Sequence, residues 1–290
     1  MGYCTVQEVK DAINFPATGA PVSDAVIQSF IGYAEEEIED IYHTKFGNVE
    51  YSSTATSGDS TTITDSAATY TVDEYLGYVV WVYSGTNAGE YREIQANTGT
   101  ALTVSPAFTA AIDNTSLFRI TKLGYKDETL DGSGEKYQFV KYQPLIILNA
   151  LTIDSTSVST SYVYQYQDAG RLLLSTSAEV TNFRINEPKL VNMKYVYGVY
   201  PMPQIIKRLC VLLASMRTLV AQIAGTYDDF TSLSLPGGLQ ASKGEPYVNI
   251  QSGLAFMQGE ARGIVYGFQG DQVTSDWRSQ QSYRPFTLFG

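Results

Sequence analysis

The chain has 290 residues, 44% of them hydrophobic and 17% charged, so it can bury a real core and is not a disordered polypeptide. Its formal net charge is −11. The excess lies in residues 1–122, which carry 5 Lys and Arg against 16 Asp and Glu, while residues 123–290 carry 14 of each. Because an acidic surface repels phosphate, the electrostatic footprint of a nucleic-acid-binding protein is absent.

Residues 1–46 predict two helices. Thr5 and Glu8 have the spacing of a capping box, which indicates a short helix that ends before Pro16. Ser23 can cap a second helix, which should end near Phe46 and Gly47. Its apolar positions recur at spacings of three and four: Ile27, Ile31, Ala34, Ile38 and Ile41. Its other face is acidic and comprises Glu35, Glu36, Glu37, Glu39 and Asp40.

Residues 47–122 predict an inserted small β domain. The composition shifts here to Thr, Ser, Tyr, Gly and Val, which suit short strands. Alternating apolar residues over 78–83 indicate a strand, and Ser84–Gly89 has the composition of a turn rather than of a phosphate-binding loop, because Glu90 stands where such a loop has Lys.

Residues 123–226 predict an antiparallel sheet followed by a long helix over 204–224, with Gly225 as its stop. One side of this helix carries Ile205, Leu209, Leu212, Met216, Leu219 and Ile223. The expected strands are 136–140, 146–151, 163–166, 171–174 and 191–196. Residues 227–290, rich in Gly and aromatic residues and without a clear period, predict an extended C-terminal arm that orders on a partner. The fold class expected is therefore α+β: a helical core with an antiparallel sheet, an inserted β domain and this arm.

Candidate chemistry is sparse. The single His43 lies at the predicted end of the acidic helix, where an exposed histidine is the ordinary interpretation. Cys4 and Cys210 do not have metal-ligand or redox spacing, so we expect two reduced thiols in a reducing cytoplasm. Residues 127–138 imitate a calcium loop, but Gln138 replaces the bidentate Glu, and a hairpin turn over 130–134 is the simpler interpretation. No catalytic residue, metal or cofactor is expected.

Neither a secretory signal nor a membrane span is expected. Residues 1–20 lack a basic region followed by an apolar run and a cleavage site. The most apolar stretch, 205–224, contains Lys207, Arg208 and Arg217, which favours a buried or docking helix.

An ordered set of segments resembles the head-tail adaptor (connector) family of tailed bacteriophages. The set consists of residues 5–10 and 23–40, then 130–134, 142–146 and 151–154, then 191–198 with a Pro pair and the helix from Gln204. Residues 76–78, 84–89, 92–94 and 102–108 resemble a small β module that recurs in phage structural proteins. The inserted module and the long arm are additions to the compact adaptor pattern.

The resemblance implies a non-enzymatic virion protein of the neck, assembled in the host cytoplasm. Such a protein forms a homo-oligomeric ring, often of about twelve copies, beneath the portal protein. DNA passes through the ring without specific binding, and a stopper or tail-completion protein docks on it. In that setting Glu35, Glu36, Glu37, Glu39 and Asp40 are candidates to face the channel. The candidates for portal docking are the arm residues Trp277, Arg278, Tyr283, Arg284, Phe286 and Phe289.

Two other classes of function stay open. The Tyr and Trp content and the β-rich middle also suit a carbohydrate-binding or tail-fibre-type β module, although the two long helices have no role in one. A hydrolase that uses paired carboxylates is a third hypothesis, but no pair stands out among the many acidic residues.

Overall fold

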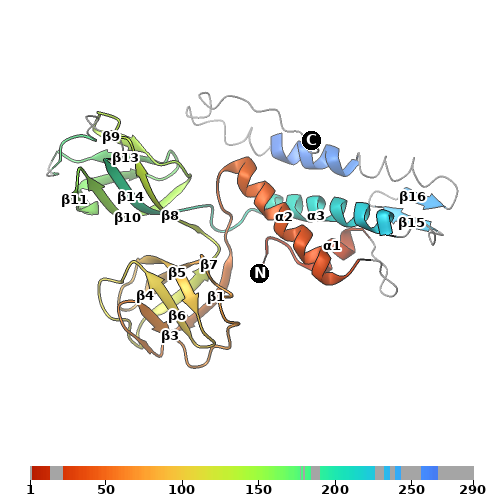
Figure 1. Ribbon diagram of the computed structural model, residues 1–290, viewed down its shortest axis with the longest axis horizontal. Helices are drawn as coiled ribbons and strands as arrows, with labels where there is room; N and C mark the ends of the chain where they lie inside the picture. Colours follow the sequence, from red (N-terminus) through yellow and green to blue (C-terminus); the bar gives the residue numbers. More distant parts are fainter. Residues whose placement is uncertain are drawn as a thin grey trace. The chain divides into compact units, whose positions relative to one another are not determined.

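The chain folds into two compact units. The computed structural model describes residues 2–13, 22–176, 178, 180–183, 190–225, 232–235, 239–242 and 256–266. One unit, here called the helical unit, comprises Met1–Ile41 and Pro203–Gly290. The other, the β unit, comprises Tyr42–Met202. The β unit is therefore inserted in the sequence between two helices of the helical unit (Figure 1).

The first helix, α1 (Val6–Ala12), begins at the predicted capping box. The Glu8 backbone N–H donates to Thr5 Oγ1 at 3.2 Å, and the Thr5 N–H donates to Glu8 Oε2 at 3.0 Å. Two backbone donors that the helix itself leaves open are thereby satisfied. The capping-box prediction is confirmed.

The second helix, α2 (Asp24–Tyr42), buries the predicted apolar stripe. Ile27, Ile31, Ala34 and Ile38 are fully buried, and Ile41 is partly buried. The helix ends at Tyr42, earlier than predicted, because His43 has a left-handed backbone with φ of 52°. His43 is exposed, as its position in the sequence indicated.

The third helix, α3 (Gln204–Gly225), is buried on more than one side. Leu209, Met216 and Leu219 of the predicted stripe are buried, but so are Ile206 and Leu213, while Ile205 is 39% exposed. The buried surface of α3 is therefore wider than the predicted stripe and does not include Ile205. Among the described residues, no helix combines the length and apolar character that crossing a bilayer requires.

Part of the segment expected to be an extended arm is folded. Residues 256–266 form a helix, with Met257, Ala261 and Val265 buried at spacings of four. Glu260 in this helix pairs with Arg208 of α3. Gly259 and Gly263 lower the helix propensity of the segment, which is why its period was not recognised. A two-stranded pair, β15 (Ser232–Leu235) and β16 (Leu239–Ser242), precedes it.

The first part of the β unit is a seven-stranded antiparallel sheet in the order β1-β7-β4-β5-β6-β3-β2. Its inner side chains form one core that includes Val80, Val82, Ile94 and Phe118. The predicted turn at Ser84–Gly89 joins β4 to β5 and is confirmed. The strands are β1 (Val49–Thr54), β2 (Ser57–Gly58), β3 (Thr62–Thr64), β4 (Val79–Ser84), β5 (Tyr91–Asn97), β6 (Ala101–Ser105) and β7 (Leu117–Thr121).

The second part of the β unit has two further sheets that share one core. A four-stranded sheet has the order β11-β10-β14-β8, and a three-stranded sheet has the order β12-β13-β9. Leu148, Leu172, Met193 and Tyr195 belong to their common core. The strands are β8 (Gly124–Leu130), β9 (Tyr137–Phe139), β10 (Leu145–Ile153), β11 (Thr156–Val158), β12 (Val163–Tyr166), β13 (Arg171–Leu174) and β14 (Val191–Tyr197), with a 3-10 turn at Thr160–Tyr162.

The predicted hairpin turn over 130–134 is wrong. The strands on its two sides belong to different sheets, because β8 pairs with β14 and β9 pairs with β13. The segment is a connection between two sheets. Turn residues set a local bend, but they do not determine which strand the chain pairs with afterwards.

The expected α+β fold class with a helical adaptor core is also wrong. The described structure is 34% strand against 27% helix, and it includes the curled seven-stranded sheet. The physical reason is that a two-residue period continues through most of 49–197, whereas helical periods are confined to a few separate segments. The protein is mainly β.

Candidate functional site

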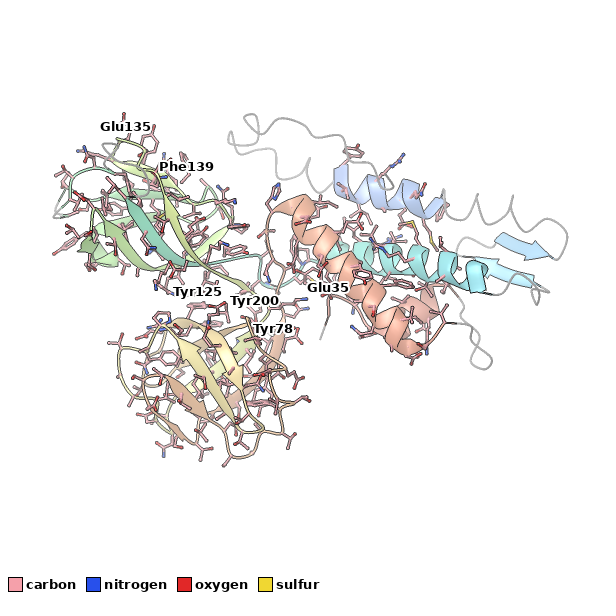
Figure 2. All side chains as sticks on the ribbon, in the orientation of Figure 1. Glu35, Tyr78, Tyr125, Glu135, Phe139 and Tyr200 are labelled. Atoms are coloured by element: carbon pink, nitrogen blue, oxygen red, sulfur yellow. The ribbon has the colours of Figure 1, made fainter. Side chains whose placement is uncertain are left out.

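Three of the five acidic side chains expected to face a channel make contacts inside the helical unit. Glu35, labelled in Figure 2, is buried and accepts a hydrogen bond from the Tyr3 backbone N–H. Glu39 accepts one from the Tyr3 hydroxyl at 2.7 Å. Glu37 forms an ion pair with Arg217 of α3 at 2.6 Å. These carboxylates hold α2 against its neighbours.

The other two acidic side chains, Glu36 and Asp40, are exposed. Neither makes a hydrogen bond or ion pair with a described residue. Tyr33, whose side chain is 56% exposed, precedes them on the same side of the helix, because positions i, i+3 and i+7 are neighbours on a helix surface. Tyr33, Glu36 and Asp40 are called the outer line of α2 below.

The six candidates for portal docking have no described position. They lie outside the described residues: Trp277, Arg278, Tyr283, Arg284, Phe286 and Phe289.

The three-stranded sheet presents a row of aromatic side chains to solvent. Directly opposed residues of antiparallel strands point to the same side of a sheet. The register places Tyr164, Leu173 and Tyr137 in one such row, and Tyr166, Arg171 and Phe139 in the next. The four aromatic side chains are 42–61% exposed, and Phe139 is labelled in Figure 2. These six residues are called the aromatic face.

The opposite side of the same sheet explains why this face is open. Leu172 and Leu174, which alternate with the exposed positions of β13, are buried in the core of the β unit. A strand with one side in the core must direct every second side chain outward. The outward positions of the neighbouring strands β12 and β9 are aromatic rather than polar, and exposed apolar clusters of this kind mark interaction sites.

The aromatic face has one charged group. The Arg171 guanidinium lies over the Tyr166 ring, with its carbon 4.1 Å from the ring centroid. Its Nε is buried and has no hydrogen-bond partner among the described residues. Arg171 forms no ion pair with a described carboxylate. A cation that is held on a ring and has no counter-ion in the described part of the chain favours an anionic partner.

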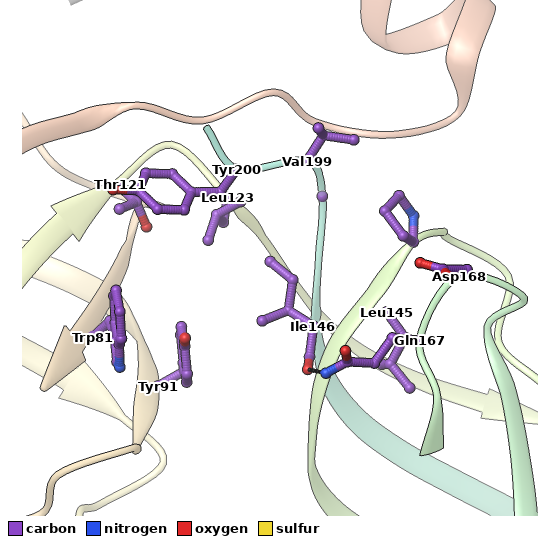
Figure 3. A pocket seen from close by; sticks show the side chains of 12 residues that line it. Trp81, Tyr91, Thr121, Leu123, Leu145, Ile146, Gln167, Asp168, Val199 and Tyr200 are labelled. Atoms are coloured by element: carbon purple, nitrogen blue, oxygen red, sulfur yellow. Dashed lines mark hydrogen bonds between the residues drawn. The ribbon is translucent and has the colours of Figure 1, made fainter. Parts of the chain in front are cut away.

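A separate pocket of about 300 Å³ lies within the β unit (Figure 3). Trp81 of β4 and Tyr91 of β5 line one side, and their rings stack with centroids 5.4 Å apart and planes 3° apart. Gln167, Asp168 and Tyr200 supply polar groups to the lining. The pocket therefore combines an aromatic surface with hydrogen-bonding groups.

The polar groups of the pocket differ in how available they are. Gln167 Nε2 donates to the Ile146 carbonyl at 2.7 Å, so this amide nitrogen already has a hydrogen-bond acceptor in the protein. The Asp168 side chain is exposed. Burial, and to a smaller extent Tyr200, raise the pKa of Tyr91, which keeps its hydroxyl neutral at physiological pH. Asp168 and the Tyr200 hydroxyl are thus the groups most open to a ligand.

The described residues contain no group of three or more His, Cys, Asp or Glu side chains that could hold a metal ion. The two thiols, about 200 positions apart in the sequence, are nevertheless neighbours. Cys4 and Cys210 are both buried, with their Sγ atoms 3.3 Å apart and no disulfide between them. Their separation in the sequence gave no sign of this proximity.

The aromatic face was missed although its signal is present in the sequence. Tyr164 and Tyr166 alternate within a predicted strand, and Tyr137 and Phe139 alternate within another. Aromatic residues favour strand formation wherever they lie in a strand. Their two-residue period also predicts that they share one side of a sheet.

No protein-family model matches the chain, and a search of curated protein sequences finds no match.

Proposed function

We propose that this chain is a non-enzymatic structural protein of a tailed bacteriophage, a head-tail adaptor that forms a ring beneath the portal protein. In this role it forms a channel for DNA. It also forms a docking platform for the next neck component, which is a stopper or tail-completion protein. It acts in the neck of the virion after assembly in the host cytoplasm. The ordered segments that resemble the adaptor family support the proposal.

The observation that carries the proposal is that both units expose clustered apolar side chains. On α2, Val26 and Tyr33 are exposed, with the partly buried Phe30 between them, at spacings of four and three. In the β unit the aromatic face is exposed. A protein that joins two components needs at least two interfaces, and large exposed aromatic side chains are typical anchors of interfaces.

Charge supports the passage of DNA without specific binding. The net charge of −11 opposes phosphate, and Glu36 and Asp40 add exposed carboxylates without counter-ions among the described residues. Of the five acidic candidates on α2, these two make no hydrogen bond or ion pair with the described residues of the helical unit. We expect reversal of Glu36 and Asp40 to Lys to slow DNA exit from assembled particles, as measured by ejection kinetics.

The test of the adaptor role is assembly on the portal. The purified chain is mixed with its portal protein, and the product is imaged by electron cryomicroscopy so that the copies around the axis can be counted. We expect a closed ring on the narrow end of the portal. Tyr33→Asp should weaken assembly more than Gln28→Asp, an exposed control on the same helix with the same added charge. A chain that never associates with the portal contradicts the proposal.

A carbohydrate-binding module is the second candidate, and the pocket in Figure 3 favours it. A stacked Trp and Tyr pair beside an exposed carboxylate can bind a sugar ring by its apolar side and its hydroxyls. Glycan binding by the purified chain, abolished by Trp81→Ala and retained in Tyr33→Ala, would support this candidate over the adaptor.

A further inference from the structure

The aromatic face is large enough to contribute to an interface but too small to form one alone. At 42–61% exposure, its four rings leave roughly 400 Å² of side chain open, half of the ~800 Å² that each partner buries in a stable interface. A partner must therefore also contact surface around the face. Arg171, on the central strand of the sheet, has no counter-ion among the described residues, which favours a partner that brings a carboxylate.

The chain itself carries a matching surface on the outer line of α2. Tyr33 offers an exposed ring, and Glu36 and Asp40 offer two carboxylates on the same side of the helix. Neither carboxylate has a counter-ion among the described residues, and Arg171 also lacks one there. The two surfaces are complementary: one has rings and an uncompensated cation, and the other has a ring and uncompensated anions.

We propose that the aromatic face of one copy binds the outer line of α2 of a second copy. Tyr33 packs among the four rings, and Glu36 or Asp40 pairs with Arg171. Because two different surfaces meet, the contact is heterologous, and repeated contacts of this type close into a ring when the rotation between copies allows it. The inference rests on the ring of the proposed function and identifies the contact that builds it.

The test exchanges the two charges. Self-association of the purified full chain is measured by sedimentation velocity over a concentration series. Arg171→Glu alone and Glu36→Arg alone should each weaken association at least about tenfold. The first places a carboxylate against the carboxylates of α2, and the second places a cation against Arg171. The chain that carries both substitutions should recover most of the lost association, because an ion pair can form again with its two charges exchanged between the surfaces.

Two controls separate this contact from general effects. Asp11→Arg, on the exposed side of α1, makes the same change of charge as Glu36→Arg in the same unit and should leave association unchanged. Arg171→Lys retains the cation and should have a small effect. Circular dichroism of each variant verifies that the fold is kept.

Three results would overturn the inference. One is a wild-type chain that stays monomeric at every concentration; another is association that Arg171→Glu does not change. The third is an Arg171→Glu variant that self-associates normally but loses a glycan or another protein, which would show that the face has a different occupant. The adaptor role is judged separately, by whether a ring forms on the portal, and it would survive all three.

Discussion

In the helical unit most of the bonded carboxylates join segments that are distant in the sequence, whereas in the β unit some hold the turns in which they lie and others join distant strands. Glu8 pairs with Lys207 at 2.5 Å, and Glu37 pairs with Arg217. By contrast, Asp59 accepts hydrogen bonds from the Thr61 backbone and hydroxyl, two residues away. The acidic side chains thus serve mainly tertiary structure in the helical unit. In the β unit they serve both, since Glu128 accepts from the Tyr195 hydroxyl at 2.6 Å.

The difference follows from how each architecture satisfies the hydrogen-bonding groups of its backbone. Helices satisfy most of their own peptide groups, so their side chains are available to bind other helices. Sheets leave open donors at their turns, and short acidic side chains accept from them. We therefore expect substitution of a bonded acid in the helical unit to affect contacts between distant segments, and substitution of an acid that holds a turn of the β unit to affect the β unit alone.

Oxidation should stabilise the helical unit alone, because the β unit contains no cysteine. Cys4 Sγ and Cys210 Sγ must approach from 3.3 Å by about 1.3 Å to form a disulfide. Diamide accepts the two electrons and two protons and becomes the hydrazine. The bond would close a loop between residues 206 positions apart and raise the free energy of unfolding of this unit by up to about 5 kcal/mol.

Thiol titration in denaturant and mobility on a non-reducing gel would detect the disulfide, and denaturant unfolding would measure its effect. Cys210→Ser is the control and should show no response to diamide. Covalent dimers in place of an intramolecular bond would contradict the prediction.

Core truncations should act on one unit at a time. Ile38→Ala in α2 and Leu172→Ala in β13 both remove fully buried side chains, and each should cost about 3 kcal/mol. Hydrogen exchange followed by mass spectrometry should show lost protection in α2 and α3 for the first variant, and in β9–β14 for the second. Loss of protection in both units from either variant would show that the two cores are coupled.

Glu35→Ala should destabilise the helical unit by about 2 kcal/mol, because it removes the acceptor of the buried Tyr3 N–H. Glu36→Ala is the matched control, since the neighbouring side chain is exposed, and it should change stability by no more than about 0.5 kcal/mol. Urea unfolding monitored by circular dichroism gives both values. Equal effects would mean that Glu35 has no special structural role.

Local features of the fold were predicted well from the sequence. The bounds of β12 and β13 coincide with the predicted strands, and the capping box at Thr5 and four positions of the α2 stripe are confirmed. These signals lie within windows of a few residues, where propensity and periodicity act directly. The helix over 256–266 is the local exception, since two glycines weaken its pattern.

Contacts between distant segments could not be predicted. The pairing of β8 with β14, the approach of Cys4 to Cys210 and the use of Glu35 inside the helical unit all depend on which surfaces the fold brings together. A run of acidic residues on a helix indicates a solvated face, but whether one of them is buried depends on the neighbouring segment. Here the neighbour is Tyr3, more than thirty residues away.

The smallest effect concerns Asp113, which joins two loops of the β unit. Asp113 accepts hydrogen bonds from the Thr115 hydroxyl at 2.6 Å and the Thr86 hydroxyl at 2.7 Å. These bonds lower the pKa of Asp113 from 3.8 to about 2. A carboxylate with a lowered pKa in the folded state adds stability above its unfolded pKa and loses it as the pH falls through its folded pKa. Stability from Asp113 should thus decline between about pH 4 and pH 2.

Asp113→Asn should flatten the pH dependence of β-unit unfolding over that interval and leave the protection of α2 and α3 unchanged, because the hydrogen bonds join residues of one unit only. An NMR titration of the Asp113 carboxyl group should show a midpoint near pH 2, and Thr86→Val should move it upward by removing one donor. A midpoint at the ordinary value would mean that the hydrogen bonds from Thr115 and Thr86 do not stabilise the charged form of Asp113 in solution.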